Sequence, residues 1–281
     1  MSPDDPMIST AELNARLGAP DLKVVDGSWF LDGADARALF EREHIPGAVF
    51  FDLDAISEQA TNLPHMLPSP SSFAAAVGTL GIAAGDEIVV YDAQGLFSAA
   101  RVWWMFRVMG ARRVRVLDGG LPKWRAEGRP IAAGPATPQP VKFGATGSSG
   151  SLADVSAVQA SLASPDQQVV DARPAARFSG EAPEPRPGLR RGHMPGARNL
   201  PFSAVLNGDK TLKSAEDLRA AFAAAGVDPG RPVIATCGSG VTAAIIVLAL
   251  ARLGRDARLY DGSWAEWGAL DDLPVATGRA T

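Results

Sequence analysis

Residues 233–253 read VIATCGSGVTAAIIVLALARL and hold the only cysteine of the chain, Cys237. The first four residues are apolar and partly β-branched and follow Pro232, which predicts a buried strand. The run from Ala243 to Leu253 is rich in Ala, Leu and Ile and is closed by Gly254, which predicts a helix. Cys237 is therefore expected in a tight loop between the end of a strand and the N-terminus of a helix.

This loop is typical of an anion-binding site. Gly238 and Gly240 allow the backbone to curl so that its N–H groups point at one centre. The helix dipole contributes only about 0.3–1 kcal/mol there, whereas charge-assisted N–H bonds contribute roughly 1.5–3 kcal/mol each. Several such bonds would make Cys237 a thiolate at neutral pH, so we predict a reactive cysteine and not an inert buried one.

Composition limits the class of protein. The chain has 281 residues, 46% of them hydrophobic, and a net charge of -4, which fits one large or two ordinary globular domains. No basic run indicates a nucleic-acid surface, and no apolar run reaches the ~18 residues of a membrane span. One cysteine excludes internal disulfides and multi-cysteine metal sites. The N-terminus is acidic and polar, so we expect no signal or transit peptide and a cytoplasmic protein.

The two halves of the chain repeat the same text at an offset of about 145 residues. The matching segments are 23–26 with 168–171, 44–48 with 193–197, 80–86 with 225–231, and 118–124 with 261–267. The repeat is too long for a solenoid unit. We therefore predict two copies of one domain, at residues 1–131 and 152–281. They would be joined by a linker at 132–151, where Pro, Gly, Ser and Thr dominate.

Each copy alternates short apolar strands with helices. In the first copy we predict strands at 22–25, 88–91 and 114–117 and helices at 35–43, 73–78, 100–109 and 122–127. The second copy repeats this, most clearly in helices at 215–225 and 242–253. Such alternation predicts an α/β fold, in which each domain has a mostly parallel sheet with helices on both faces.

The copies differ where chemistry is expected. Aligning 88–91 with 233–236 places Asp92 opposite Cys237, so only the second copy carries a thiol. We expect the first copy to support the site and line a cleft, since ligands favour domain interfaces and the carboxyl ends of parallel strands.

Three segments resemble the two-domain rhodanese-like sulfurtransferases. They read F-x-x-x-H-I-P-G-A at 40–48, R-V-W-W-M-F at 101–106, and A-x-x-Y-D-G-S-W-x-E-W at 257–267. Within the family, the 237–242 loop resembles that of mercaptopyruvate sulfurtransferases, because thiosulfate sulfurtransferases usually have basic residues where this chain has Gly238 and Ser239. Thiosulfate is a small dianion that a basic loop favours, whereas mercaptopyruvate suits a neutral loop if cations elsewhere bind its carboxylate.

The resemblance implies sulfur transfer from 3-mercaptopyruvate through a persulfide on Cys237, with release of pyruvate. A thiol acceptor such as reduced thioredoxin, or cyanide in vitro, would then take the sulfur. The family needs no metal, nucleotide or flavin, and the chain has no G-x-G-x-x-G or P-loop segment. We expect a monomer without nucleic-acid or membrane partners.

The resemblance also assigns site residues. Arg177 and Arg186 match the two arginines that bind substrate in the family, and a guanidinium can clamp a carboxylate; without the resemblance, arginines in a polar loop would be read as solvated. The loop residues expected to line the substrate and persulfide site are Gly238, Gly240, Val241 and Thr242, with Thr242 also capping the next helix.

Ser239 is expected to polarise the substrate carbonyl or pass a proton. In the family it is paired with a histidine and an aspartate from the first domain, which here would be His44 and Asp35. His44 also fits a purely structural role, because His193 stands in the same H-x-P-G-A text. His65, in a polar loop, is expected to be exposed.

Three alternative functions are compatible with parts of this sequence pattern. Thiosulfate sulfurtransferase activity on the same scaffold is opposed only by the neutral loop. A cysteine phosphatase would need an arginine six residues after the cysteine, where this chain has Ala243. A non-catalytic persulfide carrier or sensor would lose little on replacement of Arg177 and Arg186 by alanine.

Overall fold

The computed structural model of the chain describes residues 5–147 and 149–279. It forms two compact units. The first, here the N-unit, comprises the described residues of Met1–Gln59, Leu67–Ser148 and Gly208–Leu212, and the second, the C-unit, those of Ala60–Met66, Ser149–Asn207 and Lys213–Thr281. Each unit thus includes a short segment from the other half of the sequence.

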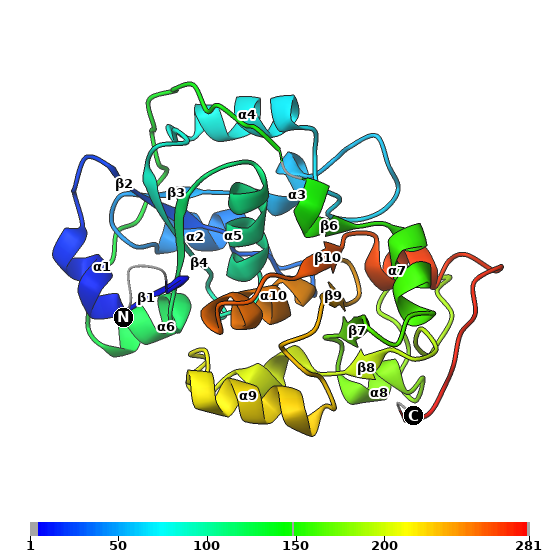
Figure 1. The fold of residues 1–281 in the computed structure, drawn as a ribbon. Coiled ribbons are helices and arrows are strands. Elements are labelled where there is room, and N and C mark those ends of the chain that lie inside the picture. The colour runs from blue at the N-terminus through cyan, green and yellow to red at the C-terminus, as the bar shows by residue number, and fades with distance from the viewer. Residues whose placement is uncertain (1–4, 148, 280–281) are drawn as a thin grey trace. The chain divides into compact units, whose positions relative to one another are not determined.

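The N-unit is built on a five-stranded parallel sheet (Figure 1). Its strands are β1 (Met7–Ile8), β2 (Leu22–Asp26), β3 (Ala48–Phe50), β4 (Glu87–Tyr91) and β5 (Arg113–Leu117), in the order β1-β5-β4-β2-β3. All five residues of β4 are buried, as expected for a strand covered on both faces.

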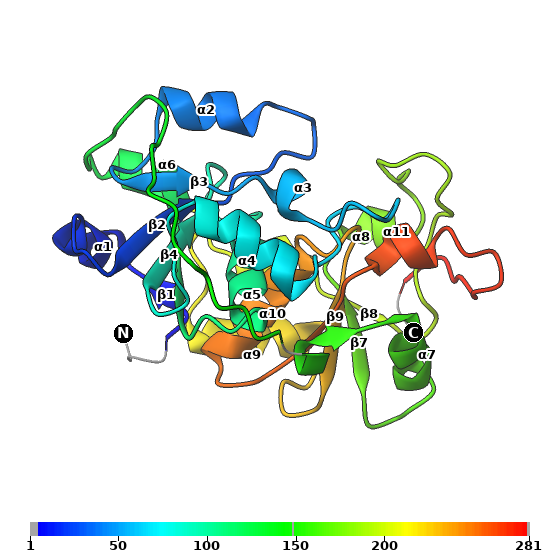
Figure 2. The same ribbon diagram turned by 90° about the horizontal axis from the view of Figure 1, so that it is seen from above.

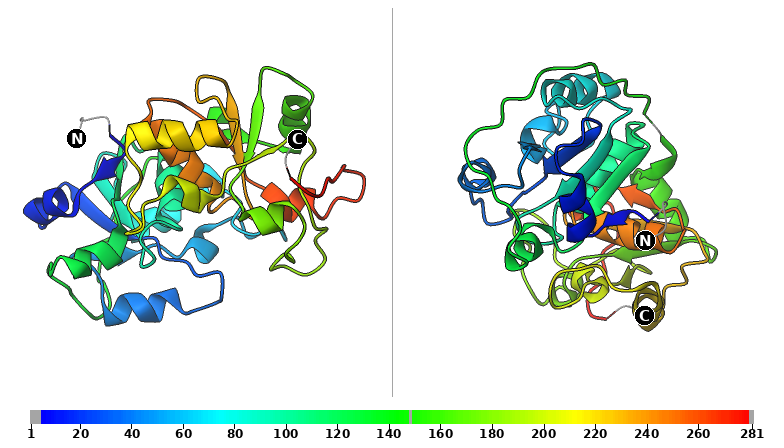
Figure 3. Two further views of the ribbon diagram at one scale, coloured as in Figure 1. Left: turned by 90° about the horizontal axis from the view of Figure 1, so that it is seen from below. Right: turned by 90° about the vertical axis from the view of Figure 1, so that its left-hand side faces the viewer.

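Helices cover both faces of this sheet (Figure 2). On one face lie α1 (Thr10–Arg16), α2 (Ala36–Arg42) and α6 (Gly120–Ala126), which place Leu13, Phe40 and Trp124 in one core cluster. On the other lie α4 (Pro70–Thr79) and α5 (Ala99–Val108), while α3 (Leu53–Ile56) follows β3. Figure 3 shows α2 and α6, in blue and green, on the same side of the sheet.

The C-unit repeats this design. Its parallel sheet has the order β6-β10-β9-β7-β8. The strands are β6 (Leu152–Ala153), β7 (Gln168–Asp171), β8 (Arg198–Asn199), β9 (Val233–Thr236) and β10 (Arg258–Tyr260). The α/β fold with two parallel sheets predicted from the sequence is confirmed.

The helices of the C-unit match those of the N-unit. The residues of α7 (Val155–Leu162), α8 (Ala175–Phe178) and α11 (Ser263–Trp267) join one core cluster with the sheet. Two further helices are α9 (Ala215–Ala224) and α10 (Ala243–Arg252), and 3₁₀ turns lie at Ser149–Ser151 and Phe202–Val205. The first eight residues of α10 are all buried, which explains its apolar sequence. No helix in the described part of the chain has the length and apolar character needed to cross a membrane.

His44 and His193 make the same contacts in the two units. His44 Nδ1 lies 2.8 Å from the carbonyl oxygen of Phe40, and His193 Nδ1 lies 2.9 Å from that of Phe178. Each ring also stacks on the same phenylalanine, with centroids 4.2 and 3.8 Å apart. Burial lowers the pKa of His193. The repeated H-x-P-G-A text is therefore a structural element that holds a turn.

Residues 132–147, assigned to a linker by the sequence analysis, pack onto the N-unit in this structure. Phe143 is buried and contacts the rings of Phe73 and Phe106. The Val141 N–H donates to the Gly78 carbonyl at 2.9 Å. The segment lacks helices and strands, as its composition predicts, but it is a fixed part of the N-unit core; residue 148 lies outside the described residues.

Candidate active site

Cys237 directly follows β9, which lies between β10 and β7 in the C-unit sheet. Cys237 is buried, with 2% of its surface exposed. The loop of residues 237–242 then leads into α10, so the predicted strand, loop and helix are all present. The thiol therefore lies at the carboxyl end of a parallel sheet, where α/β proteins place their ligands.

The loop is fastened to the N-terminal end of α11. The carbonyls of Cys237 and Gly238 accept hydrogen bonds from the N–H groups of Trp264 and Ala265, at 3.0 and 2.9 Å. The Ser263 hydroxyl oxygen accepts from the N–H groups of Cys237 and Gly240, at 3.2 and 3.1 Å, and its O–H donates to the Tyr260 carbonyl at 2.8 Å. One buried serine thus fixes the curvature of the loop.

The role of Ser263 was not predicted from the sequence. Its backbone has φ 50°, a conformation that favours glycine. The corresponding residue of the N-unit is Gly120, with φ 54°. The sequence signal for this role is that the second copy has Ser263 where the first copy has Gly120. A residue other than glycine is strained in this conformation and needs a compensating contact.

The corresponding loop of the N-unit surrounds an acidic side chain with backbone donors. Asp92 occupies the position of Cys237, and its carboxylate accepts hydrogen bonds from the N–H groups of Phe97, Ser98 and Ala99, at 2.7, 3.0 and 2.9 Å. The last of these residues begins α5, as Ala243 begins α10. Because two loop N–H groups of the C-unit are bound to Ser263, the donors for a sulfur anion are expected between 241 and 243.

The histidine beside Ser239 is His65. Its Nδ1 lies 3.1 Å from Ser239 Oγ, and both residues are buried, with 4% and 6% exposure. The sequence analysis expected His65 to be exposed, which is wrong, because segment 60–66 folds as part of the C-unit. It also expected His44 and Asp35 at this place, but His44 is bound to Phe40, and Asp35 caps α2 by accepting from the Ala38 N–H at 2.9 Å.

The remaining loop residues are positioned as follows. Val241 is buried, Thr242 is partly buried, and Gly240 adopts φ 75°, which requires its lack of a side chain. Thr242 makes no side-chain cap on α10, which corrects the expectation that it would. The backbone of Thr242 is already helical there, so its hydroxyl is not in the geometry of a capping residue.

Arg177 lies against the loop at Gly238. A Cβ atom at Gly238 would come within 2.9 Å of Arg177 Nη2, so the absence of a side chain permits this approach. Arg177 comes from α8 and forms an ion pair with Glu184, which lies in the Pro-rich loop of residues 181–187. The side chain of Arg177 is 17% exposed and that of Glu184 is 2% exposed. The structure therefore brings one of the two predicted substrate arginines to the cysteine loop.

A buried charge network supports Arg177. Glu184 also binds Arg173 at 2.7 Å, and Arg173 binds Asp171 at 2.6 Å. Burial opposes the charge of Arg173, but the two carboxylates outweigh this effect and raise its pKa. Its guanidinium also lies 4.2 Å from the ring centre of Trp264. Such a network fixes the Pro-rich loop at the site.

Arg186 lies two residues beyond Glu184 on the same loop and is partly buried. Its part in substrate binding remains a prediction. Together, the C-unit places one buried thiol, a Ser–His pair and an arginine around a neutral glycine-rich loop. This set can hold a small carboxylate, form a covalent bond to sulfur and move a proton.

The chain belongs to the rhodanese-like family, since the family model described as "Rhodanese-like domain" matches it twice, at residues 9–127 and 154–270. Among curated relatives, the 3-mercaptopyruvate sulfurtransferase of Escherichia coli (strain K12) is 43% identical over 267 residues, covering 94% of this chain and 95% of the relative. The thiosulfate sulfurtransferase of Bos taurus is 45% identical over 253 residues, covering 88% and 85%. The crystal structure of SseA from Escherichia coli, a 3-mercaptopyruvate sulfotransferase, matches with a TM-score of 0.85 and 38% identity, covering 92% of this chain and 98% of that one.

Proposed function

We propose that the protein is a 3-mercaptopyruvate sulfurtransferase, which transfers sulfur to a thiol acceptor through a persulfide on Cys237. The observation that carries this proposal is the Cys237 loop itself. It presents a buried thiol between a strand and a helix, has no cationic residue among positions 238–242, and has Arg177 packed against Gly238.

The substrate choice follows from where the charge lies. A neutral loop gives little attraction to the second charge of thiosulfate, while Arg177 and Arg186 supply guanidinium groups for one carboxylate. Relatives of this chain carry both names at similar identity, so identity alone does not separate the two substrates. The neutral loop favours mercaptopyruvate, with thiosulfate as the alternative substrate.

The chemistry needs two displacements. The Cys237 thiolate attacks the sulfur of mercaptopyruvate, so that an S–S bond forms and the C–S bond breaks. The electron pair passes to the enolate of pyruvate, which takes a proton at its terminal carbon. Ser239 lies two residues after Cys237 and is hydrogen-bonded to His65, so this pair supplies a path for that proton.

An acceptor thiolate then attacks the outer sulfur of the persulfide. The new S–S bond forms on the acceptor, and Cys237 leaves as a thiolate. A dithiol such as reduced thioredoxin suits this step, because its second thiol releases the sulfur as hydrosulfide. The protein would work as a monomer in a reducing compartment such as the cytoplasm, where a lone thiol stays reduced.

The intermediate can be tested without an acceptor. The wild-type protein is mixed with excess mercaptopyruvate, and both intact mass and released pyruvate are measured. We expect one added sulfur atom per chain and one equivalent of pyruvate in the first turnover, and neither in Cys237→Ser. Pyruvate release from Cys237→Ser at the wild-type rate would overturn the proposal.

A carrier that merely holds sulfur is distinguished by Arg177→Ala/Arg186→Ala. A carrier would still load from a small persulfide donor and lose little. We expect the double variant to load from such a donor but to lose mercaptopyruvate turnover.

A further inference from the structure

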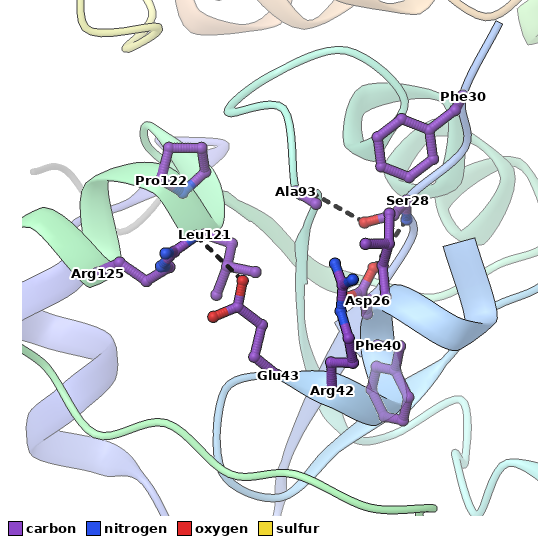
Figure 4. Close-up of a pocket in the computed structure, with 11 residues that line it drawn as sticks. Asp26, Ser28, Phe30, Phe40, Arg42, Glu43, Ala93, Leu121, Pro122 and Arg125 are labelled. Carbon is purple, nitrogen blue, oxygen red and sulfur yellow. Dashed lines mark hydrogen bonds and ion pairs between the residues drawn. The ribbon is translucent and has the colours of Figure 1, made fainter. Parts of the chain in front are cut away.

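The N-unit contains a cavity of about 240 Å³ at the carboxyl ends of β2 and β4 (Figure 4). It is lined by Asp26, which ends β2, by Ala93, which follows β4, and by Leu121 of α6. In the repeat this position lies beside that of the cysteine loop, because Ala93 follows Asp92, the counterpart of Cys237, while Asp92 itself does not line the cavity. Ligands of parallel α/β sheets bind at such strand ends.

Three positions near the cavity differ between the repeats, and one of them is Tyr91, which replaces Thr236 and makes a side-chain hydrogen bond with Asp26. In the C-unit, the guanidinium of Arg173 fills the space between Asp171 and Trp264: its Nε lies 3.0 Å from Asp171 Oδ2 and its carbon 4.2 Å from the ring centre. The N-unit has Ser28 in place of Arg173 and Leu121 in place of Trp264. Both N-unit residues are smaller than their counterparts, which leaves room beside Asp26 that the Tyr91 side chain does not fill completely.

The carboxylate that held the guanidinium is retained. Asp26 corresponds to Asp171, is 1% exposed, and accepts the N–H of Ser28 at 2.9 Å, as Asp171 accepts that of Arg173 at the same distance. No lysine or arginine among the described residues forms an ion pair with Asp26. Burial raises the pKa of Asp26 to about 6, although hydrogen bonds from Ser28 and Tyr91 act in the opposite direction. These neutral donors do not supply the cation that an ionised buried carboxyl needs.

A glutamate lines the cavity near the position of a second acceptor of Arg173. In the C-unit, Arg173 Nη2 donates to the carbonyl of Gly192 at 2.8 Å. Gly192 precedes His193 as Glu43 precedes His44, and Glu43 lines the cavity. The residues Arg42 and Arg125, both exposed, line it as well, and Arg125 binds Glu43 at 3.0 Å.

We propose that the N-unit cavity binds a small compound with a guanidinium or amidinium head and a carboxylate tail. The planar cation would pair with the Asp26 carboxylate and lie over Leu121, as the Arg173 guanidinium lies on Asp171 and Trp264. The tail would meet Arg42 or Arg125. The cavity is below the range of roughly 300–1,000 Å³ that holds drug-sized ligands, so the compound is small. This site is separate from the sulfur-transfer site and does not depend on its chemistry.

The test is calorimetric titration of the full chain with 4-guanidinobutyrate. The comparison probe is 4-aminobutyrate, which has the same tail and the same charges but a compact ammonium. We expect saturable binding of the guanidino compound with one site per chain, at least tenfold tighter than that of the amino compound. A crystal soaked with the guanidino compound should show its head at Asp26.

Two variants disrupt the proposed guanidinium-binding position at Asp26 in different ways. Asp26→Asn keeps the shape and the acceptor for Ser28 but removes the charge, and Ser28→Arg supplies the protein's own guanidinium, as Arg173 does. We expect both to weaken binding at least tenfold. Glu41→Gln is the matched control, because it neutralises an exposed carboxylate one residue from Arg42 that does not line the cavity, and it should bind as the wild type does.

Circular dichroism and turnover of mercaptopyruvate report whether each variant is folded. Loss of affinity in folded Asp26→Asn and Ser28→Arg, with none in Glu41→Gln, supports the proposal. Absence of saturable binding to the wild type, equal affinity in Asp26→Asn, or a crystal in which Arg42 itself pairs with Asp26 would overturn it.

Discussion

At the scale of single residues, Ser263 carries more of the site than its place in the sequence indicates. Its hydroxyl is buried and satisfies two N–H groups of the cysteine loop and one carbonyl. Leaving a buried donor without a partner costs about 1–3 kcal/mol. The shape of the loop, and with it the position of Cys237, therefore depends on one oxygen atom.

Ser263→Gly tests this dependence, because glycine adopts the required φ of 50° without strain, as Gly120 does in the N-unit. We expect the variant to fold, and its kcat/KM for mercaptopyruvate to fall about tenfold or more as two N–H groups lose their acceptor. Ser263→Ala should be less stable than Ser263→Gly because alanine is strained at this φ. Wild-type kcat/KM in the glycine variant would show that the hydroxyl does not position the loop.

The two histidines of the first half of the sequence give a paired prediction. His65→Asn removes the ring bound to Ser239, and we expect kcat to fall roughly 10²-fold or more, the usual effect of losing an acid–base group. His44→Asn removes the stacked ring on Phe40, so it should lower the unfolding midpoint and leave kcat nearly unchanged. Steady-state kinetics and thermal unfolding of both variants separate the roles; the reverse pattern would restore His44 to the site.

At the scale of elements, the 237–242 loop is positioned by contacts with three elements of the C-unit. β9 delivers Cys237, α11 binds two loop carbonyls, and α8 brings Arg177 against Gly238. The neutral residues after the cysteine thus do two things: they keep positive charge out of the loop and they leave room for the arginine of α8.

Gly238→Ala tests the second of these effects. The new Cβ would stand 2.9 Å from Arg177 Nη2, so the guanidinium must shift from its present place. We expect KM for mercaptopyruvate to rise about fivefold to tenfold, as for a weakened charge-assisted hydrogen bond, while kcat changes less. An unchanged KM would mean that Arg177 does not hold the substrate at this position.

Most elements of the fold could be predicted from local sequence. The strand at 233–236 was predicted with its observed bounds, and the helix after it was found within a residue at its ends, because periodicity and glycine ends are local signals. The alternation of strands and helices predicted parallel sheets, but the strand order and the short edge strands β1, β3, β6 and β8 were not predicted, because two or three residues carry no periodic signal. By contrast, His65 was misplaced because segment 60–66 folds with the C-unit through distant contacts that leave no pattern in its own sequence.

The resemblance pointed to His44 and Asp35 as partners of Ser239, and the structure shows local contacts for both. The H-x-P-G-A text drew attention to His44, although the repeat itself gave the better reading, since His193 makes the same contact. Asp35 likewise has a local contact of its own, since it caps α2, as expected for an aspartate before an apolar helix.

At the scale of the whole molecule, duplication separates two tasks. The C-unit uses the strand-end position for a thiol, whereas the N-unit uses it for Asp92, whose carboxylate is saturated by backbone donors. The N-unit also retains Asp26 without the arginine that neutralises its counterpart. Ionisation of the buried Asp26 carboxyl should therefore lower the free energy of unfolding of the molecule.

This cost sets the pH dependence of unfolding. The pKa of Asp26 is raised from 3.8 to about 6 by burial, so the stabilisation linked to its proton is complete below about pH 4 and is lost as pH rises through 6. Two pKa units correspond to about 3 kcal/mol. We expect Asp26→Asn to match the wild type near pH 4 and to be more stable by about 2–3 kcal/mol near pH 8 in urea unfolding. If Asp26→Asn and the wild type had equal free energies of unfolding at both pH values, the raised pKa assigned to Asp26 would be contradicted.

The most direct test of the central claim compares two substrates. Pyruvate release from mercaptopyruvate with a dithiol acceptor is measured beside thiocyanate formation from thiosulfate and cyanide, for the wild type and Cys237→Ser. The neutral loop predicts a kcat/KM for mercaptopyruvate well above that for thiosulfate, with both activities lost in the variant. A preference for thiosulfate would show that cations outside the loop set specificity and would contradict the role assigned here to Gly238 and Ser239.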